Sequence, residues 1–139
     1  MKVTTVGRYG LQAVLNIASA AQGKRVIARD IAEEEHISIE FLQQILSRLR
    51  QKHIVKSRRG PKGGYTIGRD PADITVLSIL DAVGEDSSLL PREAGGKAND
   101  PVAGKNAKIM ADFWADTAIE LKKNFNEISV KDLFTKYLP

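Results

Sequence analysis

The stretch SIEFLQQILSRLRQKHIVKSRRGPKGGY, residues 38–65, decides the fold of this chain. Its first half predicts a helix that begins at Ser38, a favourable N-cap residue, and that is apolar at the spacing of one helical face. This buried stripe consists of Leu42, Ile45, Leu46 and Leu49. The opposite side is polar and consists of Glu40, Gln43, Gln44, Ser47 and Gln51. We therefore expect a helix that packs on a core along one edge and presents hydrogen-bonding side chains along the other.

A shorter helix precedes this one. Residues 28–35 predict a helix whose Ile31 and Ala32 face inward, and His36 and Ile37 then form a tight turn. Two short helices joined this closely are typical of the helix-turn-helix unit, in which the second helix enters the major groove of DNA through its N-terminal half. The side chains presented there would be those of Ser38, Glu40, Gln43 and Gln44.

The polar edge of the second helix suits contact with base pairs. Gln can bond bidentately to adenine, Glu can accept from the amino group of cytosine, and the positive end of a helix favours phosphate. A solvated polar face, which most surface helices have, explains this segment equally well. The hairpin that follows shifts the balance towards DNA.

The second half of the stretch predicts that hairpin. Residues 54–57 and 65–67 predict two strands, joined by the Gly- and Pro-rich turn RRGPKGG at 58–64, and residues 25–27 can form a further short strand. A cation-tipped hairpin directly after a helix-turn-helix is a wing, and its Arg59 would be drawn to the negative potential of a narrow minor groove. A solvated hairpin with ordinary surface cations is the alternative.

The charge is distributed as this interpretation requires. Seven cations and no carboxylate lie between residues 48 and 62: Arg48, Arg50, Lys52, Lys56, Arg58, Arg59 and Lys62. Residues 1–84 carry 13 Lys/Arg against 8 Asp/Glu, a net charge of +5, whereas residues 85–139 carry 8 against 9, a net charge of −1. Duplex DNA is therefore the expected partner. The expected DNA-contacting residues are Ser38, Glu40, Gln43, Gln44, Ser47, Arg48, Arg50, Arg58, Arg59 and Lys62.

The N-terminal segment predicts a further helix that begins at Thr4 or Thr5 and ends at Gly23. Its expected buried face consists of Leu11, Val14, Leu15 and Ala18. Gly7 and Gly10 are poor helix formers, so their place in the first turns indicates either the close approach of another backbone or a frayed start.

After the wing, the chain predicts a short helix and then a long loop. Thr75 can cap a helix over 76–83, and Gly84 stops it. The inward residues of that helix are Val76, Ile79, Leu80 and Val83. Residues 85–105 are rich in Gly, Pro, Ser and Asn without any period, so they either contact an effector or partner protein or are disordered. The apolar residues available for such a contact are Leu89, Leu90 and Val102.

From Asn106 a long helix carries more apolar surface than one small domain can readily cover. Its stripe consists of Met110, Phe113, Trp114, Thr117 and Leu121, widened by Ile109, Ala118 and Phe125. We expect this helix to pack against its symmetry mate in a homodimer, and a helix folded back on its own domain is the alternative. Ser129 with Asp132 then predicts a capping box for a short terminal helix.

Composition argues against several other functions. The chain has no Cys, which excludes disulfides and thiolate-bound metal, and His36 and His53 lack the spacing of a metal-binding pair. Residues 60–64 lack the order of a phosphate-binding loop, and no nucleophile can be paired with a base, so an enzyme is not indicated. There is neither an 18-residue apolar run nor a leader peptide, so we expect a cytoplasmic protein that does not enter the membrane.

Three segments resemble a known family: VTTVGRYGLQAVLNIA at 3–18, ISIEFLQQILSRLR at 37–50, and RRGPKGGYTIGRDPADITVLSILDAV at 58–83. They are similar to the bacterial winged helix-turn-helix regulators of the IscR, NsrR and CymR type, with weaker similarity at Trp114 and at 128–134. The resemblance implies a dimeric transcription factor, usually a repressor, that reads a pseudo-palindromic operator. By position, it implies base or backbone contacts from Ser38, Glu40, Gln43 and Gln44, and an Arg59 that enters the minor groove.

The resemblance also bears on cofactors and partners. Cluster-binding members of the family carry three cysteines in the loop that corresponds to 85–105, and this chain has none, so we expect no iron–sulfur cluster and no other cofactor. The CymR branch also lacks these cysteines and is regulated by forming a complex with a metabolic enzyme of cysteine biosynthesis. Control by complex formation with such an enzyme is therefore the alternative to a switch that is gated purely by a small-molecule effector. RNA binding has little support, because no exposed aromatic residues on a sheet are indicated.

The expected organisation is mainly α with a small β wing. Residues 1–84 form the DNA-binding domain, 85–105 a flexible loop, and 106–139 the dimerisation helix and the short terminal helix.

Overall fold

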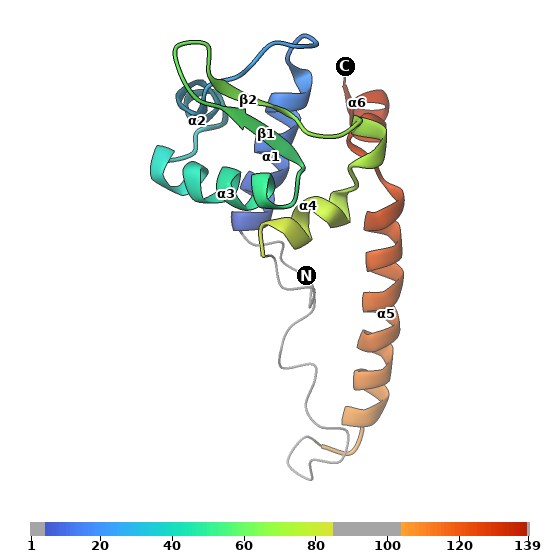
Figure 1. Ribbon diagram of the computed structural model, residues 1–139. Helices are drawn as coiled ribbons and strands as arrows, with labels where there is room; N and C mark the ends of the chain where they lie inside the picture. The colour runs from blue at the N-terminus through green and yellow to red at the C-terminus, as the bar shows by residue number, and fades with distance from the viewer. Residues whose placement is uncertain (1–4, 85–103, 139) are drawn as a thin grey trace.

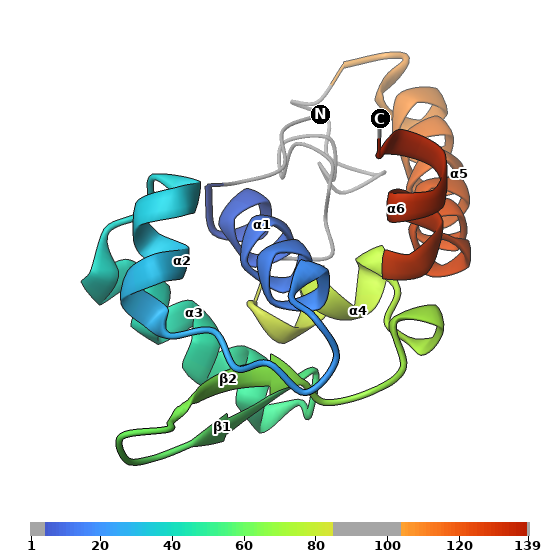
Figure 2. The same cartoon turned by 90° about the horizontal axis from the view of Figure 1, so that it is seen from above.

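The computed structural model describes residues 5–84 and 104–138, and the fold is mainly helical with one two-stranded antiparallel sheet (Figures 1 and 2). The elements in chain order are α1 (Thr5–Ser19), α2 (Ala28–Glu35), α3 (Ile39–Gln51), β1 (Val55–Arg58), β2 (Gly64–Ile67), the 3-10 turn η1 (Pro71–Asp73), α4 (Val76–Ala82), α5 (Ala107–Glu127) and α6 (Val130–Tyr137). The expected fold class is confirmed. The calls on Thr4, on Leu89, Leu90 and Val102, and on most of the 85–105 loop lie outside the described residues.

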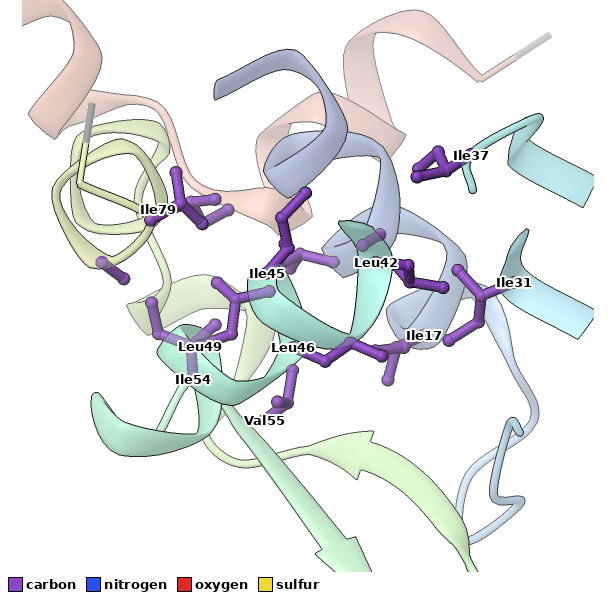
Figure 3. Packing of buried hydrophobic residues seen from close by; sticks show 14 of the residues in the cluster. Ile17, Ile31, Ile37, Leu42, Ile45, Leu46, Leu49, Ile54, Val55 and Ile79 are labelled. Atoms are coloured by element: carbon purple, nitrogen blue, oxygen red, sulfur yellow. The ribbon is translucent and has the colours of Figure 1, made fainter. Parts of the chain in front are cut away.

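Helix α3 lies at the centre of the core (Figure 3). Its predicted stripe is confirmed, because Leu42, Leu46 and Leu49 have no exposed surface and Ile45 is only 1% exposed. Buried side chains from the neighbouring elements surround this stripe, and they include Ile17, Ile31, Ile54, Val55 and Ile79. Burial of a side chain of this size contributes about 1.5–3 kcal/mol, so the core fixes the rotation of α3 about its own axis.

The prediction for α1 was partly wrong. Leu11, Leu15 and Ala18 are only half-buried at the margin of the core, and Val14 alone of the predicted face is buried. The buried residues of α1 are Gly7, Gly10, Ala13, Val14, Asn16 and Ile17. The helix packs against α2, α3 and α4 together, so its inward face is set by several neighbours and is displaced from the most apolar line of the sequence.

Gly10 explains part of that displacement. A Cβ atom added to Gly10 would lie 2.9 Å from Cγ1 of Val83, whose side chain is fully buried. The predicted close approach at Gly10 is therefore present, but the neighbour is a side chain at the end of α4 and not a second backbone. The helix also ends at Ser19, earlier than predicted, and Gly23 adopts a φ of +80° in the turn that follows.

Both histidines occupy turns at helix ends. His36 (φ 56°) closes α2 through a bond from its backbone N–H to the carbonyl of Ala32, and His53 (φ 59°) follows the end of α3. Histidine is among the non-glycine residues that tolerate this left-handed conformation best. Both side chains are exposed, and within residues 5–84 and 104–138 no group of three potential ligands could hold a metal ion.

The wing is an antiparallel hairpin with a third segment beside it. Residues 55–58 pair with 64–67 in the register Val55↔Ile67 to Arg58↔Gly64. The predicted strand at 25–27 is reduced to one bridge, in which Val26 donates to the Tyr65 carbonyl at 3.0 Å and accepts from the Tyr65 N–H at 2.8 Å. The hairpin is thus joined to the segment between α1 and α2.

The C-terminal helices return to the body of the fold. Val130 is fully buried, its N–H donates to the carbonyl of Ile74 at 2.8 Å, and the N–H of Val76 donates to Ile128 at 2.9 Å. The predicted capping box of Ser129 and Asp132 starts α6. Helix α5 runs along one side, and its N-terminal half extends beyond the other helices (Figure 1). No helix in the described ranges is long and apolar enough to span a membrane.

Candidate nucleic-acid interface

The polar edge of α3 faces solvent. Glu40, Gln43 and Gln44 are exposed and Ser47 is half-buried. Together with Arg48 and Gln51 they line one shallow hollow on the protein surface. Because the opposite edge of α3 is buried in the core, these side chains project from a helix that cannot readily turn.

The N-terminus of α3 is capped as the sequence predicts. The Oγ atom of Ser38 accepts from the backbone N–H of Phe41 at 3.3 Å. An N-cap satisfies one free amide, while the remaining amides of the first turn keep the positive end of the helix dipole. This end of α3 therefore attracts an anion such as a backbone phosphate.

Two arginines of α3 already make contacts inside the protein. Nη1 of Arg48 donates to the carbonyl of Val83 at 2.7 Å, which ties α3 to the end of α4. Nη1 of Arg50 donates to Oγ of Ser57 on β1 at 3.4 Å. A guanidinium has five N–H donors, so each arginine keeps donors for a phosphate while one N–H holds its neighbour. The sequence did not predict that these arginines also form hydrogen bonds inside the protein.

The wing tip carries the cations that the sequence predicts. Arg58, Arg59 and Lys62 are exposed, and none of them forms an ion pair with any residue in the described ranges. The turn is tight: Gly60 has a φ of +102°, and the N–H of Gly63 donates to the Gly60 carbonyl at 2.8 Å. The positive charge is thus concentrated on a short turn without a local counter-ion, which favours contact with a polyanion.

The interface combines two adjacent elements. The chain passes from α3 into β1 within a few residues, and buried Ile54 and Val55 seat the base of the hairpin on the same core as α3. A third contact braces this base, because Nη2 of Arg69 donates to the carbonyl of Lys52 at 3.1 Å. The polar edge of α3 and the base of the hairpin are therefore held on the same core, and the hairpin extends from that core (Figure 1).

Other supporting residues were missed by sequence reasoning. Asn16 is 9% exposed, and its Nδ2 donates to Oε2 of Glu34 at 2.8 Å and to Oε1 of Glu35 at 3.0 Å. Nε2 of Gln12 donates to Glu35 as well, at 3.3 Å. This network joins α1 to α2 and so fixes the first helix of the helix-turn-helix. One signal was available: Asn16 interrupts the apolar helix at a position that falls between predicted core residues.

The predicted dimerisation stripe is divided by the structure. Met110 and Phe113 are 45% and 53% exposed, whereas Trp114, Thr117 and Leu121 are half-buried. Towards the C-terminal end, α5 packs on α4, and Oγ1 of Thr75 donates to Oδ1 of Asn126 at 3.4 Å. Ile109 and Ile119, at 66% and 64%, add to the exposed apolar surface. The exposed N-terminal part of α5 agrees with a dimerisation helix, whereas the C-terminal part folds back on its own domain.

Comparison with known proteins identifies the family. The model of Rrf2, described as an iron-dependent transcriptional regulator, matches residues 3–136. The chain belongs to the Rrf2 family. It is a DNA-binding transcriptional regulator of the IscR and CymR type, which is a family of regulators and not of enzymes.

Relatives and solved structures support the assignment. The HTH-type transcriptional regulator IscR of Yersinia pseudotuberculosis is 35% identical over 133 residues, which cover 96% of this chain and 79% of that protein. The structure of CymR, the global cysteine regulator of B. subtilis, covers 97% of each chain with a TM-score of 0.77 and 27% identity. T. potens IscR aligns with a TM-score of 0.74 and 28% identity, over 97% of this chain and 87% of its own.

The residues present do not fit the iron–sulfur cluster that the family resemblance raises. Such clusters are held mainly by cysteine thiolates, with histidine as a less common ligand. This chain contains no cysteine, and its two histidines, His36 and His53, stand in separate turns at the ends of α2 and α3. Two separate imidazoles without any thiolate do not make up the set of ligands that holds an iron–sulfur cluster.

Proposed function

We propose that this Rrf2 regulator binds a pseudo-palindromic DNA operator as a homodimer and represses transcription without an iron–sulfur cluster. The observation that carries the proposal is that the exposed polar edge of α3 and the wing are seated on one core, while the cations of the wing tip form no ion pair with any described residue. The N-terminal half of α3 would enter the major groove, and the wing would lie over the adjacent minor groove.

The chemistry of the two parts differs and supports a division of labour. Glu40, Gln43 and Gln44 can read base edges in the major groove, where each good bidentate pair contributes about 1–3 kcal/mol of discrimination. Arg59 would sit in the narrow minor groove of an A·T tract. Ser38, Ser47, Arg48, Arg50, Arg58 and Lys62 would mainly contact phosphates, which position the protein and add affinity without sequence preference.

A homodimer would supply the second half of the interface. Exposed Ile109, Met110 and Phe113 form an apolar surface on the part of α5 that extends from the body. Two copies joined there by a two-fold axis would present two α3 helices to successive major grooves, whose separation is about 34 Å in B-DNA. The half-site spacing of the operator therefore reports on the dimer.

The test begins with selection of bound duplexes from random DNA by the purified protein. An inverted repeat is expected, with half-sites about one helical turn apart or a multiple of it. On the selected operator, Arg59→Ala should weaken binding by about 1–3 kcal/mol at fixed salt, because one groove contact is lost. Lys123→Ala, which removes an exposed cation from α5, is the matched control and should leave the affinity unchanged.

Other outcomes would contradict the proposal. If Arg59→Ala binds the operator as tightly as the parent protein, the wing makes no groove contact. If no duplex is enriched even at low salt, sequence-specific recognition is wrong. Repression is tested separately with a reporter gene behind the selected operator, and its expression should rise when the regulator is removed.

A second candidate concerns the signal that controls the regulator. The lack of cysteine together with the likeness to CymR favours control by complex formation with a metabolic enzyme, or by a small molecule, over control by a cluster. Anaerobic incubation with iron and sulfide should produce no cluster absorbance and no change in operator affinity. Stoichiometric cluster formation that alters DNA binding would overturn this part of the proposal.

A further inference from the structure

The wing tip is held by a residue that belongs neither to the hairpin nor to α3. Arg25 lies between α1 and α2, and its Nη1 donates to the main-chain carbonyl of Lys62 at 2.6 Å across a separation of 37 residues. One residue further on, Val26 forms the two-bond bridge with Tyr65. Figure 2 shows this segment running beside β2. Tyr65 pairs with Ser57, the second pair of the hairpin from the turn, so the turn and the strand residue next to it share one lateral support.

Gly64 allows this support to lie close to the wing. Its φ is +138°, and an added Cβ atom would lie 2.9 Å from the Val26 carbonyl oxygen and 3.1 Å from Cβ of Arg25. No side chain could occupy that space without moving the backbone. The absence of a Cβ at Gly64 thus lets the segment with Arg25 approach β2 and brings the guanidinium within reach of Lys62.

Few other contacts hold the tip. Each strand of the hairpin has four residues, and a two-stranded hairpin of that length is marginally stable in water by itself. Within the turn, the bond from Gly63 to Gly60 is local and does not fix the turn relative to the core. The bond from Arg25 is long-range and connects the turn to the body of the protein.

We propose that Arg25 is a positioning residue for DNA binding, which orders the wing tip before the duplex is met. By fixing the carbonyl of Lys62, Arg25 holds the turn on which Arg59 and Lys62 stand. A turn that is already ordered loses less conformational freedom on binding, so more of the contact energy is expressed as affinity. This inference rests on the proposed function, because it assigns Arg25 a role in the binding of the wing to DNA.

A competing role must be separated from this one. A guanidinium that donates one N–H to the Lys62 carbonyl keeps four other N–H donors. The competing role for Arg25 is therefore a direct contact with a DNA phosphate. The two roles differ in their salt dependence. Loss of a phosphate contact lowers the slope of log K against log salt by about 0.9, whereas loss of preorganisation lowers K without changing the slope.

The experiment compares Arg25→Met, Arg25→Lys and the control Lys24→Met. Lys24 is the adjacent exposed cation, and its ammonium makes no hydrogen bond to residues 5–84 or 104–138. Amide exchange is measured on the free proteins by mass spectrometry, and affinity for the selected operator is measured over a series of salt concentrations. Thermal unfolding of each variant confirms that the fold is retained.

The expected result for Arg25→Met is roughly three- to tenfold faster exchange over 59–65 and a similar loss of affinity, the scale of one net hydrogen bond, with the salt slope unchanged. Arg25→Lys keeps the charge but not the planar fork, so its affinity should stay below that of the parent. Lys24→Met should exchange at the wing as the parent does.

Three results would overturn the inference in distinguishable ways. Unchanged wing exchange in Arg25→Met shows that Arg25 does not hold the tip, whatever the DNA data. Full recovery of affinity in Arg25→Lys, with a slope lowered by about 0.9 in Arg25→Met, shows a phosphate contact instead. If the parent protein itself selects no duplex, the proposed function fails, and the positioning role for DNA fails with it.

Discussion

Helices α3 and α5 carry similar sequence patterns but occupy different environments. Both have apolar residues at helical spacing along one face. In α3, four of 13 residues are buried, and the stripe faces side chains from the neighbouring elements. In α5, none of the 21 residues is buried, although the helix is the longest in the described chain. Periodicity therefore predicts that a helix has an apolar face, but not that its own chain covers that face.

The physical reason lies in where each helix stands. Helix α3 is enclosed by α1, α2, α4 and β1, so its stripe is covered within one protomer. Helix α5 contacts chiefly α4, and its N-terminal half extends away from the body (Figure 1). Exposed apolar residues such as Ile109 and Phe113 are costly to leave in water, and a second copy of the chain is the occupant that the proposed function supplies.

The largest difference between α3 and α5 is expected when one leucine in each helix is shortened to alanine. Leu46→Ala should lower the free energy of unfolding by about 2–5 kcal/mol, because a fully buried side chain leaves a cavity at the centre of the core. Leu121→Ala on α5 should cost about 1–2 kcal/mol, because that side chain is half-buried and its site is partly open to water. Urea denaturation at low protein concentration measures both values. Equal costs would mean that the two helices are packed alike.

A smaller effect is expected at the exposed part of α5. Phe113→Lys places a charge in the proposed interface and should weaken the homodimer by about 2 kcal/mol, or about thirtyfold in Kd, with little change in the stability of the monomer. Sedimentation equilibrium measures the dimer constant. Ala115→Lys adds the same charge on the opposite side of α5 and serves as the control. A dimer that tolerates Phe113→Lys must be formed by another surface.

The smallest effect concerns how α5 and α6 are held locally. The backbone N–H of Ser129 donates to the Asp132 carboxylate at 2.9 Å. This bond is the main cause of the lowered pKa of Asp132, and the Ser129 side chain and Lys131 lower it further. Desolvation raises the pKa by a smaller amount. A lowered pKa gives stability that is present above the ordinary carboxyl pKa and is lost as the pH falls through the lowered value. Asp132→Asn should therefore destabilise the protein at neutral pH, and the difference from the parent should vanish in acid.

Asp112 on α5 provides the matched carboxylate. It pairs with Lys108 at 3.3 Å, but the side chains are 69% and 68% exposed, so the pair should contribute about 0.3–0.5 kcal/mol at most. Urea denaturation of Asp132→Asn is followed from neutral to acid pH, and that of Asp112→Asn is measured at neutral pH. A larger loss of stability for Asp112→Asn than for Asp132→Asn at neutral pH would contradict the ranking.

Sequence reasoning performed best where structure is set locally. The bounds of α2, the cap at Ser38, the four-residue stripe of α3 and the capping box at Ser129 follow from neighbouring residues, and all are confirmed. It failed in part at α1, where several neighbours compete for one helix and Gly10 admits Val83. The DNA contacts of residues such as Gln44 and Arg59 remain predictions, although their exposure agrees with them.

The sequence by itself determined the winged helix-turn-helix, the cationic turn and the lack of thiolate ligands, because capping, periodicity and composition act over a few residues or none. Only the tertiary structure decided that Arg25 reaches Lys62, that Arg48 binds the end of α4, and which part of α5 stays exposed. Those features depend on contacts between residues far apart in the chain. A guanidinium on a flexible stem can meet many carbonyls, and packing alone selects the one that it binds.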